Sequence, residues 1–295
     1  MEKIAINFFK FLKNPQEKFN KTLSLKQKWN ILFSILLLDF ILVTIASGIT
    51  SIIDTYLFEL KSEPIEDLFS NKPAYLILIL AALIVPLIEE FIFRLFLNYD
   101  RNFVFQFIDA FTNNKAKIFW DKHFKKIFYI AALLFGLMHL SNFSNTNTLF
   151  YILAPFIILP QLIGGVTLGY IRLKLGFFWG VLMHGLYNLI VFSVLLLFLN
   201  TTLLTKKNTP DYILEINKLE LGLNKPIELE IYKTETTIDS IIGNNTTVKE
   251  VANLLNLTDT VLLKKTKRIN IRFINKTDLN TPESIISTEL KKHFK

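Results

Sequence analysis

The chain has 295 residues, of which 51% are hydrophobic, and it carries a net charge of +8 and no cysteine. The lack of cysteine excludes a disulfide framework and a thiolate metal site. Much of the positive charge lies beside long apolar runs, which favours basic cytosolic loops of a membrane protein over a nucleic-acid-binding surface.

The first residues, 1–28, form a basic segment with seven lysines. Its apolar stretches are too short for the core and cleavage site of a signal peptide. The apolar residues between Ile4 and Leu12 suit either a short helix at the membrane interface or an ordinary cytosolic tail.

Five apolar runs come next, and each is close to the ~20 residues that cross a hydrocarbon core of ~30 Å. The third is the shortest. The runs are 29–53, 74–99, 127–143, 149–173 and 177–199. We therefore predict an all-α polytopic membrane helix bundle of about five spans.

The loops between these runs alternate in charge. The 54–73 loop is acidic and the 100–126 loop is basic, while Arg172 at the end of the fourth run and Lys174 just after it are expected on the cytosolic side. Because basic loops remain in the cytosol, we expect a cytosolic N-terminus and an extracytosolic C-terminus. The stretch Asn102–Thr112 is then expected on the cytosolic surface.

The composition changes near residue 205 to Lys, Asn, Thr, Asp and Glu. The stretches "PIELEIYKT" and "RINIRFINK" alternate as half-buried strands do, and "TVKEVANLL" predicts a short helix capped by Thr247. We expect 205–295 to be a small, separately folded α+β extramembrane domain. It should supply no catalytic group, and its position suggests substrate or partner binding.

Three ionisable residues lie within the second apolar run, where charges are costly and usually functional. Glu90 and Arg94 are four residues apart, so they can pair and fix helix packing. Glu89 projects about 100° away from Glu90 and lacks that partner. It is the better candidate for a general base.

Histidines occur in two further runs, each with a companion four residues away. Phe135 precedes His139 in the third, and Asn188 follows His184 in the fifth. A single membrane histidine more often bonds a neighbouring helix than catalyses a reaction. Counted at ~1.5 Å per residue from the cytosolic charges, both histidines and Glu90 fall near the bilayer midplane, where they could form a water-activating site.

The order of these residues resembles the three motifs of the CAAX protease and bacteriocin-processing (CPBP) family of intramembrane proteases. The motifs are Glu89-Glu90-xxx-Arg94, Phe135-xxx-His139 and His184-xxx-Asn188. The resemblance covers 74–199, which it marks as a four-span protease core. It does not account for the first span or the C-terminal domain.

The resemblance implies an endopeptidase that cuts a membrane-associated peptide or protein substrate in or beside the bilayer. It implies that Glu89 and His139 activate a water, while His184 and Asn188 stabilise the oxyanion. Peptide hydrolysis needs a base near the water and donors aimed at the developing negative charge. This assignment meets both needs.

The remaining motif residues have supporting roles in this interpretation. Glu90 and Arg94 hold their helix, and Phe135 shares a face with the motif histidine. The glycines of the fourth run are expected to permit close helix approach. They are Gly164, Gly165 and Gly169.

We expect no tightly bound catalytic metal. Zinc is the alternative, with Glu89, His139 and His184 as its ligands, because Glu and His are ligand types of zinc hydrolases. The HExxH pattern, which places two imidazoles on one helical turn, is absent. Asn188 also suits an oxyanion donor better than a zinc ligand.

Two other functions compete with proteolysis. A proton-coupled transporter would also place Glu, His and Arg in the membrane, but it usually has paired repeats and broken helices, which the sequence does not indicate. A catalytically silent scaffold could recruit partners through the C-terminal domain. The Lys-, Asn- and Ile-rich composition suggests a bacterial cytoplasmic membrane; the sequence defines neither the substrate, prenylated or not, nor the oligomeric state.

Overall fold

The computed structural model describes residues 2–17, 23–61, 73–199, 201–219, 227–234 and 237–294. Contacts divide the chain into one unit of 1–65 with 78–191 and a second of 66–77 with 192–295. Most of the predicted 54–73 loop, residues 62–72, lies outside the described residues.

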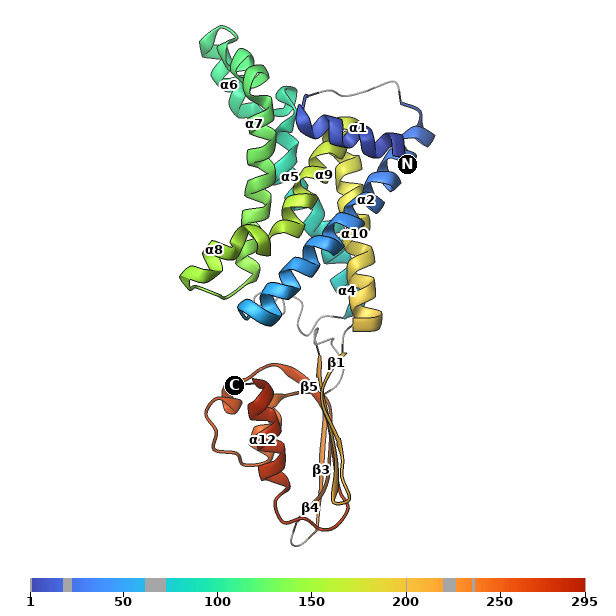
Figure 1. Cartoon of the computed structure of the whole chain (residues 1–295), viewed down its shortest axis with the longest axis vertical. Helices are drawn as coiled ribbons and strands as arrows, with labels where there is room; N and C mark the ends of the chain where they lie inside the picture. Colours follow the sequence, from blue (N-terminus) through green and yellow to red (C-terminus); the bar gives the residue numbers. More distant parts are fainter. Residues whose placement is uncertain are drawn as a thin grey trace. The chain divides into compact units, whose positions relative to one another are not determined.

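Helices make up the described part of the first unit (Figure 1). The α-helices are α1 Glu2–Lys13, α2 Leu25–Ile52, α4 Ala74–Ile79, α5 Val85–Arg94, α6 Phe103–Thr112, α7 Lys115–Met138, α8 Thr148–Ile157, α9 Leu159–Leu175 and α10 Phe177–Val194. Short 3₁₀ and π turns extend or join them: η1 Ile53–Leu57, η2 Leu80–Ile84, η3 Leu95–Leu97, η4 Tyr99–Arg101, η5 His139–Asn142 and η6 Leu195–Leu199.

Five of the helical runs are long and apolar enough to cross a membrane, and this confirms the predicted fold class. They are Leu25–Leu57, Ala74–Leu97, Lys115–Asn142, Thr148–Leu175 and Phe177–Phe198. Their length and composition identify an integral membrane protein.

Two of the helices begin before the predicted spans. The first helix begins at Leu25 because Ser24 and Gln27 form a reciprocal capping box ahead of the apolar run. The third begins at Lys115, within the stretch taken as a 100–126 loop, and the ion pair of Lys117 with Asp121 at 2.7 Å supports its polar first turns. Hydropathy locates the apolar part of a helix, and its polar turns extend further.

The helix of the fourth span is interrupted, a feature that the sequence did not indicate. Its two halves, α8 and α9, meet at Ile158, whose backbone (φ −92°, ψ 11°) departs from helical geometry. Pro160 follows in the first turn of α9, where its missing N–H costs no intrahelical bond. The break turns α8 away from the axis of α9 (Figure 1).

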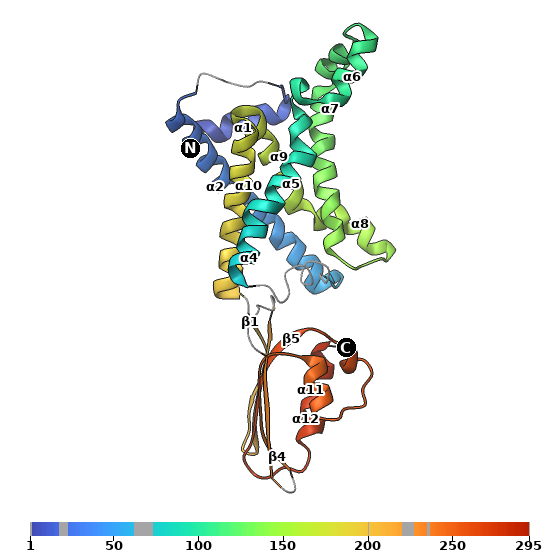
Figure 2. The same cartoon turned by 180° about the vertical axis from the view of Figure 1, so that it is seen from behind.

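The bundle core forms where α1, α2, α9 and α10 meet. Leu32, Ile35, Ile171 and Met183 are fully buried there. Phe8 of α1 packs edge-on against Tyr170, with ring centroids 5.2 Å apart. The N-terminal segment is therefore a helix packed on the bundle, lying across one end of it in both views (Figures 1 and 2).

Close approach of α7 and α9 depends on glycine, as expected for two of the three glycines. A Cβ at Gly165 would lie 3.0 Å from the carbonyl oxygen of Ala132, and one at Gly169 would lie 2.7 Å from the ring of Phe128. At Gly164 a Cβ would meet nothing within 4 Å. The expectation is wrong for Gly164, which faces open space.

The C-terminal unit contains an antiparallel five-stranded sheet of order β1-β2-β5-β4-β3. Its elements are β1 Thr201–Asn208, β2 Tyr212–Leu219, β3 Glu228–Lys233, β4 Ile238–Thr247, α11 Val248–Leu254, η7 Leu262–Lys264, β5 Arg268–Asn275 and α12 Pro282–Phe294. The helices lie against one face of the sheet (Figure 2).

The sequence predictions for this unit agree with its structure. The two alternating stretches form β3 and β5, and Thr247 caps α11 in a capping box with Glu250. The unit has a hydrophobic core of its own, in which Leu214 and Phe273 are fully buried. The sheet begins at Thr201, four residues before the predicted boundary, because β1 pairs with β2 from its first residue.

Candidate active site

A buried cluster of charges joins α5 to α10. Oε1 of Glu90 accepts from Nη1 of Arg94 at 2.6 Å and from Nδ1 of His184 at 3.0 Å. The guanidinium of Arg94 also lies over the ring of Phe135, 3.9 Å from its centroid. The predicted Glu90–Arg94 pair is present, and Glu90 additionally orients a motif histidine on another span.

Glu89 approaches the same histidine from its other side. Nε2 of His184 lies 3.6 Å from Oε2 of Glu89, so the imidazole stands between two carboxylates. Glu89 keeps 15% of its side-chain exposure, whereas Glu90 keeps none. The sequence separated these two carboxylates correctly by helical angle, but it did not indicate that both would contact His184.

The C-terminal end of α5 is held by an arginine that the sequence placed at the cytosolic end of the fourth run. Arg172 is 5% exposed, and its guanidinium donates to the carbonyls of Arg94 at 3.0 Å and Leu95 at 3.1 Å. Carbonyls at a helix end lack intrahelical donors, so this contact fixes the helix that carries both glutamates. Arg172 therefore belongs to the site's supporting structure.

Asn188 completes the turn that precedes α5. Val85 donates its N–H to the carbonyl of Leu80 in a π turn, and Pro86 has no N–H to give. The carbonyl of Ala81 is thereby left without either helical donor, and Nδ2 of Asn188 donates to it at 2.8 Å. The amide thus ties α10 to the irregular turn before the glutamates.

A glycine in the fifth-span motif makes this contact close. A Cβ at Gly185 would lie 2.4 Å from the carbonyl oxygen of Ala82, a distance that no side chain tolerates. Gly185 therefore lets α10 approach η2 closely enough for Asn188 to reach it. The glycine that directly follows His184 could have indicated this close helix contact from the sequence, but a search for ionisable residues does not find it.

His139 lies at the end of α7 rather than within it. It is the C-cap residue, and its Nδ1 lies 2.8 Å from the carbonyl oxygen of Phe135. Because a carbonyl only accepts, Nδ1 carries the proton and Nε2 of the neutral ring keeps its lone pair. Among the described residues, His139 makes no hydrogen bond to Glu89 or His184. Its ring packs against that of Phe135, with centroids 4.8 Å apart.

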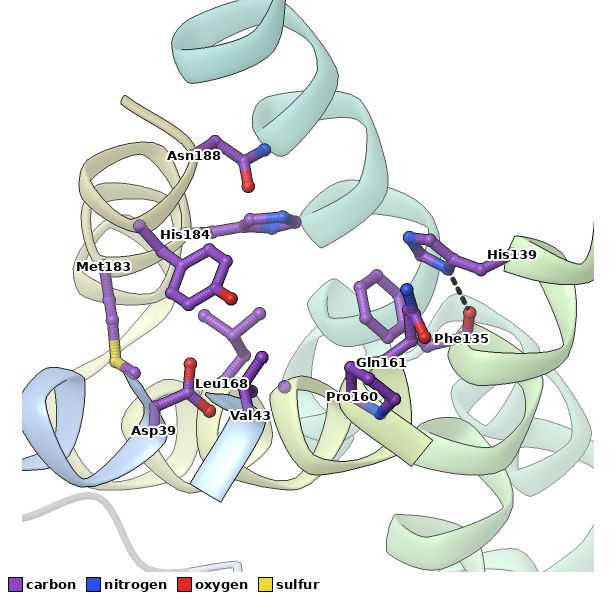
Figure 3. Close-up of a pocket in the computed structure, with 12 residues that line it drawn as sticks. Asp39, Val43, Phe135, His139, Pro160, Gln161, Leu168, Met183, His184 and Asn188 are labelled. Carbon is purple, nitrogen blue, oxygen red and sulfur yellow. Dashed lines mark hydrogen bonds between the residues drawn. The ribbon is translucent and has the colours of Figure 1, made fainter. Parts of the chain in front are cut away.

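A cavity of about 150 Å³ connects these histidines. Figure 3 shows His139 and His184 pointing into it from opposite helices, with Asn188 one turn beyond. Glu89 and Glu90 contact His184 but are not among the lining residues. Three of the four predicted catalytic residues therefore line one cavity, and the fourth touches one of them.

The cavity also contains polar residues that sequence reasoning missed. Asp39 of α2 and Gln161 of α9 both line it. Asp39 is 3% exposed and is a single acid within an apolar run. The criterion that selected Glu89, an ionisable group at membrane depth, would have selected Asp39 too.

The three alternative zinc ligands do not assemble around one point in the described part of the chain. That part contains no group of three or more His, Cys, Asp or Glu side chains placed to hold one ion. Nδ1 of His184 is bonded to Glu90, and Nδ1 of His139 to a backbone carbonyl, so Nε2 is the nitrogen that each ring keeps for a further partner.

Comparison with protein families places the motifs in a known group. Residues 71–190 match the family described as Type II CAAX prenyl endopeptidase Rce1-like. The match confirms the CPBP resemblance, and it leaves α1, α2 and the C-terminal sheet with its helices outside. No curated protein and no solved structure matches the chain.

Proposed function

Because its second to fifth spans match CAAX-type intramembrane proteases, we propose that the chain is an intramembrane endopeptidase. The site formed by Glu89, His139, His184 and Asn188 would hydrolyse a peptide bond of a membrane-associated substrate. The observation that carries the proposal is the position of His184. It is held by a buried carboxylate, lies beside a second carboxylate and opens onto a cavity.

The proposed mechanism starts with His184 as an imidazolium, because only then does its Nε2 carry a proton to donate. Its ring lies between the carboxylates of Glu89 and Glu90. Both ring N–H groups of His184 then point at carboxylate oxygens.

The proposed reaction begins with a water held near Glu89 and Nε2 of His139. Glu89 takes a proton from this water as its oxygen attacks the carbonyl carbon. Neutralised, Glu89 no longer attracts Nε2–H of His184, which can then donate to the oxyanion. The proton on Glu89 passes to the leaving amine nitrogen as the carbon–nitrogen bond breaks, which restores the carboxylate.

Asn188 contributes to this scheme in two ways. One amide hydrogen is used on the carbonyl of Ala81, so only the other is free to stabilise an oxyanion. Its bond to Ala81 also orders the turn that leads into the helix of Glu89. Both contributions require the amide group.

The test is cleavage of a peptide library by the purified full chain in lipid nanodiscs, compared with Glu89→Gln. We expect cleavage by the unaltered protein and none by the variant. The matched control is Glu2→Gln, which changes an exposed glutamate outside the family match and should cleave normally. Equal cleavage by Glu89→Gln, or stoichiometric zinc whose removal abolishes and whose return restores activity, would contradict this mechanism.

Orientation follows from the loop charges rather than from the fold. We propose a cytosolic N-terminus and an extracytosolic C-terminal unit, in a bacterial cytoplasmic membrane. If all five candidate helices cross the membrane, the two ends of the chain lie on opposite sides. Reporter fusions after residue 205 that score as cytosolic would reverse the assignment.

One observation favours a second function. The break at Ile158 and the π turn η2 are the kind of discontinuity that proton-coupled transporters place at their binding sites. Such a transporter would acidify or alkalinise proteoliposomes on adding substrate, and it would cleave no peptide. Peptide cleavage without proton movement would exclude it.

A further inference from the structure

Asp39 lies in the proposed active-site cavity but comes from outside the matched family region. It belongs to α2, whereas the match begins at residue 71. Val43, one helical turn later, lines the same cavity. The first span therefore adds a carboxylate to the site that the motif residues do not require.

This carboxylate is only half satisfied by the protein. Thr167 of α9 donates its hydroxyl to Oδ1 of Asp39 at 2.7 Å. No described residue donates to Oδ2, and no cationic side chain in the described ranges lies within ion-pair distance of Asp39. A carboxylate at membrane depth is costly without a partner.

The walls near Asp39 are mostly apolar, with Tyr187 as a polar exception. Figure 3 shows Val43, Leu168 and Met183 around its carboxylate, which faces the space that His139 and His184 enter from the other side. A buried carboxylate beside apolar side chains in a substrate cavity is the arrangement by which a protease selects a basic side chain next to the scissile bond. The stem packs on the walls while the charged end meets the carboxylate.

The carboxylate oxygen of Asp39 that accepts no hydrogen bond favours lysine over arginine. A guanidinium binds best to both oxygens of a carboxylate at once. One oxygen of Asp39 is already taken by Thr167. A lysine ammonium needs only the other, as a compact single-point donor.

We propose that Asp39 is a specificity-determining residue that binds a substrate lysine beside the bond to be cut. This inference rests on the proposed endopeptidase function and adds a substrate class to it: membrane-inserted peptides with a lysine within the apolar segment. Such a lysine is itself costly in lipid. The substrate lysine would therefore gain free energy by leaving the lipid and pairing with the carboxylate of Asp39 in the site.

A purely structural role for Asp39 predicts something different. Its bond with Thr167 joins α2 to α9, two helices with an extensive contact. Asp39→Asn keeps an acceptor oxygen for Thr167 and nearly the same volume but removes the charge. Thr167→Val keeps the charge and removes the bond.

The experiment uses apolar peptides of about 20 residues in nanodiscs with the full chain, each with a single lysine at a successive position. Matched sets replace lysine by norleucine, which keeps the stem without the charge, or by arginine. Affinity is measured on Glu89→Gln, so that no peptide is consumed, and cleavage is measured on the unaltered protein.

We expect the best lysine peptide to bind about 10- to 100-fold more tightly than its norleucine match, as for a hydrogen bond to a charged group. Arginine should fall between them. Asp39→Asn in the Glu89→Gln background should abolish the preference, while Thr167→Val should retain it. The lysine–norleucine comparison needs no change at Asp39, so it decides the question even where a variant fails to fold.

The two proposals fail in different ways. Equal affinity for lysine and norleucine peptides, with cleavage of both, would overturn the role of Asp39 and leave the protease intact. A lysine preference that depends on Asp39, without cleavage of any peptide, would support the binding site and overturn the protease. A preference that persists in Asp39→Asn would overturn the role of Asp39.

Discussion

Two units of this chain each contain a buried glutamate bonded within a cluster that includes a histidine. In the bundle, Glu90 accepts from Arg94 and His184. In the C-terminal unit, Glu289 accepts from Thr205 at 3.0 Å and Lys207 at 2.5 Å, and Nε2 of the histidine, His293, lies 3.0 Å from the same threonine hydroxyl.

The difference between the clusters lies in what remains unbonded. Both carboxylate oxygens of Glu289 have partners, and its lysine is 42% exposed to solvent. Oε2 of Glu90 and Nη2 of Arg94 are buried without a partner, and His184 opens onto a cavity beside Glu89. A saturated cluster fastens α12 to β1, whereas an unsaturated one beside a cavity retains capacity for chemistry. Residue types alone do not separate the two.

The sharpest test of this comparison exchanges one histidine in each unit. His139→Ala should lower the rate of peptide cleavage by about 10²–10⁴-fold, the usual contribution of acid–base groups. His293→Ala should leave the rate unchanged because its partner is a structural threonine. Cleavage rates of both variants in nanodiscs provide the measurement, and a large loss in His293→Ala would place the C-terminal unit in the reaction.

Removal of each buried glutamate should lower the stability of its own unit and leave that of the other unit unchanged. Glu90→Ala leaves Arg94 unpaired and should cost about 3–5 kcal/mol of bundle stability. All three tryptophans, at 29, 120 and 179, lie in the bundle, so their fluorescence during SDS titration reports that unit. Glu289→Ala should leave the tryptophan transition in place; a shift equal to that of Glu90→Ala would show that the units unfold together.

The fifth-span amide should have an intermediate effect on cleavage. Asn188→Ala removes an oxyanion donor, worth about 10²–10³-fold in rate, and also frees the carbonyl of Ala81. Asn188→Asp keeps the side-chain volume, but an ionised carboxylate cannot donate a hydrogen bond. Its cleavage rate should therefore fall as far as that of Asn188→Ala. An unaltered rate in both variants would remove Asn188 from the mechanism and leave it as a helix tie.

Acidification should give the smallest effect and act on the C-terminal unit. The hydrogen bond from Lys207 lowers the pKa of Glu289 below its ordinary value of 4.5. A depressed carboxyl pKa adds stability that is complete above pH 4.5 and is lost as the pH falls through the folded-state value. Hydrogen exchange of α12 in the full chain, corrected for intrinsic rates, should therefore accelerate below that pH. Glu289→Gln should flatten this dependence, and an unchanged profile would contradict the cause.

Periodicity and composition were enough to determine the class of this protein. Runs of ~20 apolar residues have few alternatives to a membrane helix, and strict alternation of apolar and polar residues was sufficient to predict β3 and β5. The same local logic found the Thr247 cap and the Glu90–Arg94 pair, because both are contacts between residues three or four apart.

Contacts between distant residues were decided only by the tertiary structure. The resemblance assigned Glu89 and His139 to one water, and only the fold shows that Glu89 also lies beside His184. The fold likewise buries Arg172 under the end of α5 and brings Asp39 from the first span into the cavity. Helical period fixes which face a side chain occupies on its own helix. Which helix covers that face depends on breaks such as Ile158, on glycine contacts such as Gly185 and on the packing of all the spans together, and none of these is a property of a local stretch of sequence.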